Sequence, residues 1–311
     1  MSQKNEFTLQ QLLERVNSRR RSGDAGSDRV RTITARIVGD LFRAIDDLDV
    51  SADEFWAASD WLSRLGASGQ MGLITAGLGF DRLLDIRDDE ADRAAGRATG
   101  TPRAIEGPLY IAGAPLSRYE ARVDEEGEQI PGEVMVMEGV VRDAQGRPVA
   151  GALVDVWHAN EKGRYSHFDP DQKEFALRRR IETDAQGRYR FRSYLPPGYE
   201  IPPVGPTAEL FQALGRHGNR PAHIHFLIAA PGQRVLTTQV NLPGDTFIDD
   251  DFAFATRDGL VVTLEPGTPA AGYESLGISA PFTRVQFDFT MQVARDEEES
   301  KPLARMARAV G

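Results

Sequence analysis

The stretch Val134-Met-Val-Met-Glu-Gly-Val-Val-Arg-Asp-Ala-Gln-Gly-Arg147 decides the fold class. Valines alternate along its first half with the two-residue period of a β-strand, and its second half is rich in turn-forming residues. The pentapeptide Asp-Ala-Gln-Gly-Arg returns at Asp184–Arg188, so we expect a hairpin turn at each place. Short runs of this kind, interrupted by Pro and Gly, continue from about residue 95 to about residue 293. Because no helical pattern separates them, they favour an antiparallel β-sandwich over a parallel sheet.

Upstream of this region the apolar residues have helical spacing. Between Phe7 and about Gly96 they recur at steps of three or four, and one stripe comprises Val30, Ile33, Ile37, Leu41, Ile45 and Leu48. Ser51 and Glu54 have the spacing of a capping box at the start of a second helix, and Gly66 is placed to end that helix. The sequence therefore predicts amphipathic helices before the β region.

These two regions predict an α+β fold. We expect a helical domain in residues 1–100, a β-sandwich domain in residues 101–294 and a charged tail in residues 295–311. The helices have no parallel sheet to cover, so their apolar stripes can be buried against a second copy of the chain. A homodimer through the N-terminal helices is the expected assembly.

The composition restricts the chemistry and the partners. The chain of 311 residues has no cysteine, so any metal must be held by nitrogen and oxygen atoms. The net charge of −10, without a long basic run, argues against a nucleic-acid partner. The N-terminus has no apolar signal core, and no segment has the roughly 18 uninterrupted apolar residues that a membrane span needs. We expect a cytoplasmic protein that acts on a small molecule and is not a membrane protein.

His223 and His225 are the strongest local indication of chemistry. They lie two residues apart in Pro221-Ala-His-Ile-His-Phe-Leu-Ile228, whose composition is typical of a strand. Alternate side chains of a strand lie on one face, about 6.5–7 Å apart, so both imidazoles can reach one metal ion. Two structural histidines are the alternative interpretation of the pair alone.

The other donors to such a metal must lie upstream of the pair. No histidine follows His225, and Leu227 and Ile228 stand where a metallo-hydrolase pattern would need an acid and a histidine. The upstream candidates are His158, His167, His217, Asp155, Asp169, Tyr165, Tyr189, Tyr194 and Tyr199. Tyr199 lies in a stiff Pro-rich loop, which suits a pre-positioned ligand, although a packing tyrosine is the alternative. A phenol with a pKa near 10 binds only a strongly Lewis-acidic cation, so a tyrosine ligand indicates Fe(III).

Several longer motifs resemble the intradiol ring-cleaving dioxygenases, and most of all the catechol 1,2-dioxygenases among them. The segments that carry the resemblance are Gly100–Tyr110, Asp155–Asn160, Gly163–Ser166, Pro197–Tyr199, Gly215–His225 and Asp250–Asp258. The resemblance covers nearly the whole chain up to about Val293. It implies a non-haem Fe(III), one per subunit, held by Tyr165, Tyr199, His223 and His225.

The resemblance also implies the reaction. An enzyme of this kind uses dioxygen to cleave catechol between its two hydroxylated carbons and forms cis,cis-muconate, a step in the breakdown of aromatic compounds. Tyr199 matches the ligand that leaves the metal when catechol binds and that takes one of its protons. Arg220 is placed to stabilise charge that develops on the ring, and Gln239 is its hydrogen-bonding companion. The sandwich is then the catalytic domain.

The family pattern places the substrate pocket on residues of both regions. The matching positions are Leu73, Ala76, Ile105, Pro108, Leu109, Arg220, Phe252 and Ala253. Relatives often carry proline where Ala76 stands, so substituted catechols are expected to fit as well. Family members with this helical extension are dimers that can hold a lipid between their helical domains. We expect the acids Asp249–Asp251 to be solvated turn residues without a role.

Three alternatives remain open on the sequence. Within the family, the enzyme could cleave hydroxyquinol or chlorocatechols instead of catechol. Outside it, the chain could be a non-catalytic β-sandwich binding module with structural histidines. A zinc or iron(II) hydrolase built on the histidine pair is the third.

Overall fold

The computed structural model describes residues 8–18, 26–97, 100–124, 131–269, 272–296 and 299. It divides into two compact units, Met1–Ala67 and Ser68–Gly311. The tail predicted at 295–311 lies almost wholly outside the described residues, and the boundary predicted at residue 100 stays a prediction. No helix in the described ranges is long and apolar enough to cross a membrane.

The first unit is helical, as predicted. It contains α1 (Leu9–Ser18), α2 (Asp28–Asp47) and nearly all of α3 (Ala52–Ser68). The capping box forms, because Ser51 N donates to Glu54 Oε2 at 2.9 Å and Glu54 N donates to Ser51 Oγ at 3.3 Å. Gly66 does not end the helix. The prediction was wrong by three residues, because Gly69 is the glycine that adopts the positive φ, 71°, required just past a helix end.

The second unit contains short helices and two main β-sheets. Its helices are α4 (Met71–Gly77), α5 (Phe80–Ala94), α6 (Pro206–Ala213) and the 3₁₀ turn η1 (Glu274–Leu276). The first sheet has the order β1 (Leu116–Arg118), β5 (Arg178–Glu182), β4 (Leu153–Trp157), β9 (His223–Ala229), β10 (Leu236–Asn241). The second has the order β11 (Glu265–Gly267), β12 (Phe282–Gln286), β3 (Val134–Arg142), β6 (Arg188–Tyr194), β2 (Glu120–Arg122), and β13 (Phe289–Thr290) also pairs with β3. A separate pair joins β7 (Tyr199–Glu200) and β8 (Asn219–Arg220).

The two sheets enclose one apolar core, so the predicted α+β fold with a β-sandwich is confirmed. Met137 and Phe191 of the second sheet are fully buried in one cluster with Val156 and Phe226 of the first sheet. The central strands β3 and β6, and β4, β5, β9 and β10, pair antiparallel, as expected. The short outer strands β1, β2 and β13 pair in parallel, and so does β12 with β3. These strands reach the sheets from segments distant in sequence, for which no hairpin imposes antiparallel pairing.

The two repeated pentapeptides form similar tight turns, but only in part the predicted hairpins. In each turn the Asp carboxylate accepts from the backbone N–H groups two and four residues on and pairs with the Arg side chain. The second turn, Asp184–Arg188, joins β5 of the first sheet to β6 of the second. It therefore connects the two layers of the sandwich instead of two partners within a sheet.

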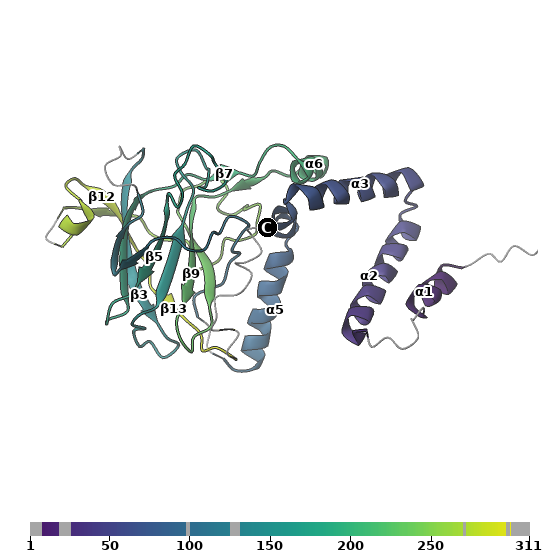
Figure 1. The fold of residues 1–311 in the computed structure, drawn as a ribbon, viewed down its shortest axis with the longest axis horizontal. Helices are drawn as coiled ribbons and strands as arrows, with labels where there is room; N and C mark the ends of the chain where they lie inside the picture. Colours follow the sequence, from purple (N-terminus) through teal and green to yellow (C-terminus); the bar gives the residue numbers. More distant parts are fainter. Residues whose placement is uncertain are drawn as a thin grey trace, which may run out of the picture. The chain divides into compact units, whose positions relative to one another are not determined.

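One face of the first sheet points away from this core. A row of four residues crosses it in register, namely Arg178 on β5, Trp157 on β4, His225 on β9 and Gln239 on β10. The alternating residues on these strands are the apolar side chains of the core. Helix α5 lies beside this side of the sandwich (Figure 1), held there by ion pairs that Arg234 makes with Asp88 and Asp92.

Candidate metal centre and substrate cavity

The two histidines of β9 converge as strand alternation predicts. Nε2 of His223 lies 3.0 Å from Nε2 of His225. Nδ1 of His223 is 2.6 Å from Pro221 O and donates to it, which leaves the lone pair on Nε2. Burial and the neighbouring Arg220 lower the pKa of His223 to about 3, and burial holds the pKa of His225 well below its usual value. Both rings are therefore neutral and able to donate lone pairs to a metal.

Two tyrosines complete the cluster from separate segments. Tyr165 lies in the loop after β4 and Tyr199 in β7, and their ring centroids are 5.6 Å apart. Tyr199 lies 5.5 Å from the His223 ring, and Tyr165 lies 6.4 Å from the His225 ring. Gly163 permits this approach, because it has a φ of 74° and an added Cβ would lie 2.5 Å from Cβ of Tyr199.

The donor set fits an oxygen- and nitrogen-bound ferric ion. Two imidazole nitrogens bound to one metal at about 2.1 Å and at about a right angle would lie about 3.0 Å apart, as these do. The Tyr165 hydroxyl is buried without a hydrogen-bond partner. Among the described residues no group of three or more His, Cys, Asp and Glu side chains could hold a metal. A metal at this histidine pair therefore needs tyrosine ligands, which disfavours the hydrolase alternative.

Arg220 connects the histidines to two further polar side chains. It is 5% exposed and donates to Asp251 from Nε at 3.1 Å, to Gln239 from Nη2 at 2.7 Å and to Nε2 of His223 from Nη1 at 3.0 Å. Gln239 in turn donates to Asn241 at 3.1 Å. The interpretation of Asp251 as a solvated turn acid was wrong, because it is buried as the counter-ion of Arg220.

A cavity of about 1050 Å³ opens in front of the cluster. All eight residues predicted for the substrate pocket line it: Leu73, Ala76, Ile105, Pro108, Leu109, Arg220, Phe252 and Ala253. Tyr165, Tyr199 and His225 line it as well, and His223 lies directly behind, against His225 and Arg220. The structure thus brings the predicted residues to one place, and their individual roles remain predictions.

Comparison with known proteins assigns the family. A family model described as "Catechol dioxygenase N terminus" matches residues 27–96, and one described as "Dioxygenase" matches residues 105–293. The chain belongs to the intradiol dioxygenase family. It is 54% identical to catechol 1,2-dioxygenase 2 of Acinetobacter lwoffii over 257 residues, which cover 83% of this chain and 92% of the relative. The crystal structure of catechol 1,2-dioxygenase from Pseudomonas arvilla C-1 is 48% identical, with a TM-score of 0.86 and 95% of each chain covered.

Members of the family named for other substrates are less similar. The chain is 35% identical to a chlorocatechol 1,2-dioxygenase of Rhodococcus opacus, which covers 70% of this chain and 82% of the relative. It is 31% identical to a hydroxyquinol 1,2-dioxygenase of Rhizobium sp., which covers 92% of this chain and 96% of the relative. Because the chain belongs to this family of enzymes, we reject the alternative of a non-catalytic binding module.

Most of the other candidate donors of this dioxygenase are occupied elsewhere. His158 is bonded through Nδ1 to Ala159 O and through Nε2 to Ser193 Oγ, at 2.8 and 2.7 Å. His167 packs edge-on against Phe175, and His217 pairs with Asp250 at 3.0 Å. The hydroxyls of Tyr189 and Tyr194 are bonded to Phe287 O and Glu161, whereas Asp169 lines the mouth of the cavity.

Sequence reasoning missed the side chains that support the cluster from behind. Trp157 stacks on His225 with ring centroids 4.9 Å apart and planes within 4°. Tyr110 meets the Trp157 ring edge-on at 4.8 Å and donates its hydroxyl to Asp155 at 2.9 Å. The available signal was the spacing of Asp155 and Trp157, which places both on the face of β4 opposite to the core valines. Such packing fixes the orientation of a metal-binding imidazole.

Asp155 gives the dioxygenase a specific pH dependence of stability. Burial raises the pKa of Asp155 to about 6, although the Tyr110 hydrogen bond opposes the rise. The folded chain therefore binds a proton that the unfolded chain releases, so this residue lowers the free energy of unfolding as pH rises from about 4 to about 6. We expect Asp155→Asn to raise the free energy of unfolding at pH 7 by up to about 2–3 kcal/mol. Urea unfolding of the iron-free wild type and variant measures this, and a difference between the two that is the same at pH 4 and at pH 7 would contradict it.

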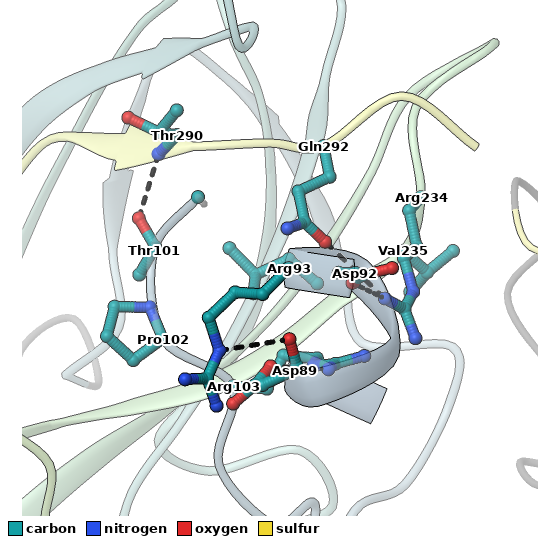
Figure 2. Close-up of a pocket in the computed structure, with 12 residues that line it drawn as sticks. Asp89, Asp92, Arg93, Thr101, Pro102, Arg103, Arg234, Val235, Thr290 and Gln292 are labelled. Atoms are coloured by element: carbon teal, nitrogen blue, oxygen red, sulfur yellow. Dashed lines mark hydrogen bonds and ion pairs between the residues drawn. The ribbon is translucent and has the colours of Figure 1, made fainter. Parts of the chain in front are cut away.

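A second, smaller cavity of about 230 Å³ lies at the end of α5 (Figure 2). Both acids that line it are paired, since Arg103 donates to Asp89 at 2.6 Å and Arg234 donates to Asp92 at 2.9 Å. Thr290 N donates to Thr101 Oγ1 at 2.8 Å on its far side. No predicted site residue lines this cavity, and its contacts fix the segment that leads into Ile105.

Proposed function

We propose that this chain is a catechol 1,2-dioxygenase that opens catechol to cis,cis-muconate with dioxygen, using one iron(III) per subunit held by Tyr165, Tyr199, His223 and His225. The observation that carries the proposal is the convergence of two neutral imidazoles and two tyrosines beside one cavity, where the described residues group no third histidine or acid with them. Iron(III) bound there would supply Lewis acidity and would draw electron density from the two catechol oxygens.

The residues around the cavity divide the remaining work. Tyr199, partly exposed on β7, takes a catechol proton on its phenolic oxygen. Arg220 presents a guanidinium whose orientation is fixed by Asp251 and Gln239, and it stabilises negative charge that develops on the ring. A metal bound through Nε2 of His223 would use the lone pair that now accepts from Nη1 of Arg220, so Nη1 would then be available to the substrate. Ile105, Leu109 and Phe252 are among the apolar walls that hold a flat ring and exclude water.

Catechol is the substrate that the similarity favours over hydroxyquinol and chlorocatechols. Ala76 leaves room at one edge of the cavity, because its side chain ends at Cβ. Catechols with a small ring substituent are therefore cleaved as well, with a lower kcat/KM than catechol itself. The kcat/KM values for catechol, 4-chlorocatechol and hydroxyquinol test this order, and a higher value for either of the last two would reverse it.

The assembly is proposed as a homodimer through the N-terminal helices, in the cytoplasm. Val30 and Leu41 on the apolar stripe of α2 are 61% and 58% exposed in a single chain, which is more apolar surface than an isolated helical unit leaves open. We also propose a lipid as a further component of that interface, as the resemblance implies. The mass in solution, by sedimentation, and extraction of lipid from the purified protein test the two parts.

The visible spectrum of the iron-loaded protein tests the proposed site. Tyrosinate bound to iron(III) produces a red charge-transfer band, which zinc, iron(II) and iron bound by histidine alone lack. We expect this band, and we expect it to shift when catechol is added without dioxygen. A colourless protein with one iron per chain would show that the tyrosines are not ligands, and the proposed mechanism would fail with them.

A further inference from the structure

Arg178 is a buried cation without a carboxylate partner in the part of the chain that the structure describes. Five arginines are less than one tenth exposed in the described part of the chain. Four of them form ion pairs: Arg190 with Glu120, Arg192 with Asp124, Arg220 with Asp251 and Arg257 with Asp85. Arg178, at 2% exposure, forms none among the described residues, and its Nη1 has no hydrogen-bond partner. A buried charge without a counter-ion strongly destabilises the folded protein, so we expect such a residue to pair with an anion that the protein acquires.

The contacts of Arg178 lead to Tyr165. Its Nε donates to Ser166 Oγ at 2.8 Å and its Nη2 to Ser166 O at 3.1 Å. Its guanidinium carbon lies 5.9 Å from the centre of the Tyr165 ring, whose buried hydroxyl makes no hydrogen bond of good geometry with the described residues. Arg178 thus fixes the residue that follows Tyr165 in the chain and faces the phenol itself.

The other charges near Arg178 form no ion pair with it among the described residues. Asp155 acts on Arg178 only through its longer-range charge, and its carboxylate accepts a hydrogen bond from Tyr110. Arg220 is close enough to act on Tyr165, but Asp251 already neutralises it. The guanidinium of an arginine stays charged at neutral pH. The group near Arg178 that can gain a negative charge is the phenol of Tyr165, when a ferric ion displaces its proton.

We propose that Arg178 is a positioning residue that provides the counter-charge of Tyr165 as a permanent tyrosinate ligand. The proposal rests on the proposed iron site. It also distinguishes the two tyrosines, because Tyr199 pairs through its strand with Arg220 and has no contact with Arg178 among those described. Tyr165 is the tyrosine with this counter-charge, which agrees with the proton-accepting role proposed above for Tyr199.

Arg178→Met removes the charge while keeping an unbranched, buried side chain. We expect iron to leave the variant for a chelator at least about tenfold faster than the wild type, in line with the effect of other residues behind metal ligands. The charge-transfer band moves to longer wavelength, since the electron on the phenolate is held less tightly. The difference in unfolding temperature between iron-loaded and iron-free protein shrinks, whereas a merely structural role would lower both temperatures equally.

Three variants make the test specific. Arg178→Lys retains the charge and restores the band position. Arg179→Met removes the next arginine, which faces the other way and donates to Arg122 O, and leaves the band unchanged. In Tyr199→Phe the remaining band belongs to Tyr165. Adding Arg178→Met to this variant therefore shifts the band by the same amount as Arg178→Met shifts it in the wild type. A colourless wild type would overturn both proposals, but a coloured wild type whose band does not respond to Arg178→Met would overturn this one alone.

Discussion

An iron-free, colourless protein without ring-cleaving activity is the expected result of His225→Ala. His225 contributes one of two Nε2 atoms that lie 3.0 Å apart, and its ring is held between Trp157 and the cavity. The three remaining donors lie on three separate segments, and each segment loses conformational freedom when its donor binds. These donors alone therefore do not retain a ferric ion against a chelator. Iron per chain, measured by elemental analysis after loading and desalting, falls from about one to background.

His158→Ala is the matched control for this loss. His158 is as deeply buried as His225, but its two nitrogens are used by Ala159 and Ser193. Truncating either ring lowers the free energy of unfolding by about 2–4 kcal/mol through the cavity and the lost hydrogen bonds. Only the His225 variant should lose iron. One iron per chain with an intact red band in His225→Ala would remove this histidine from the ligand set.

The features that were predictable from the sequence follow from local geometry. Two histidines that alternate on a strand must share a face, whatever the rest of the fold does. The capping box of Ser51 and Glu54 is likewise complete within four residues. The long motifs fixed the family because six segments occur in the same order, a coincidence that no single pair of residues provides.

The features that were missed depend on segments far apart in sequence. Asp251 looked like one of three solvated acids, and nothing local shows that the chain folds it onto Arg220. Arg178 opens the run Arg178-Arg-Arg180, which in a sequence suggests a solvated strand edge, yet its side chain lies beneath Tyr165. Buried charges of this kind are set by tertiary packing, and the parallel outer strands are set in the same way.

Arg220→Met is expected to lower both kcat and the free energy of unfolding. Arg220 acts on the reacting ring and also neutralises Asp251, and each of the two losses reports on one of these contacts. Loss of a positioned donor beside the reacting ring reduces kcat by about 10²–10³-fold. Loss of the partner of Asp251 leaves a carboxylate buried alone, which lowers the free energy of unfolding by about 3–5 kcal/mol at neutral pH. Steady-state kinetics with catechol and urea unfolding of the iron-free protein measure the two effects separately.

The stability loss has a pH dependence whose sign follows from Asp251. In the wild type, burial raises the pKa of Asp251, but the charge and hydrogen bonds of Arg220 outweigh it, so the pKa lies below its usual value. This carboxylate stabilises the folded wild type above the unfolded pKa, near 4, and the contribution is lost as pH falls through the folded pKa. In the variant that lacks Arg220, the effect of burial dominates and the pKa of Asp251 rises above its usual value. The variant's loss in free energy of unfolding relative to the wild type is therefore largest at neutral pH and shrinks towards pH 4.

Arg192→Met provides the matched control for Arg220→Met. Arg192 on β6 of the second sheet is also buried, outside the cavity lining. It is paired with Asp124 and donates to the carbonyl of Leu276 in η1. Its removal should lower the free energy of unfolding by less than that of Arg220, because Arg122 still pairs with Asp124, and it should leave kcat per bound iron unchanged. If both variants lost kcat equally, the loss in Arg220→Met would report general destabilisation. If only Arg220→Met lost it, the guanidinium acts on the substrate, and Asp251 and Gln239 matter because they hold it in place.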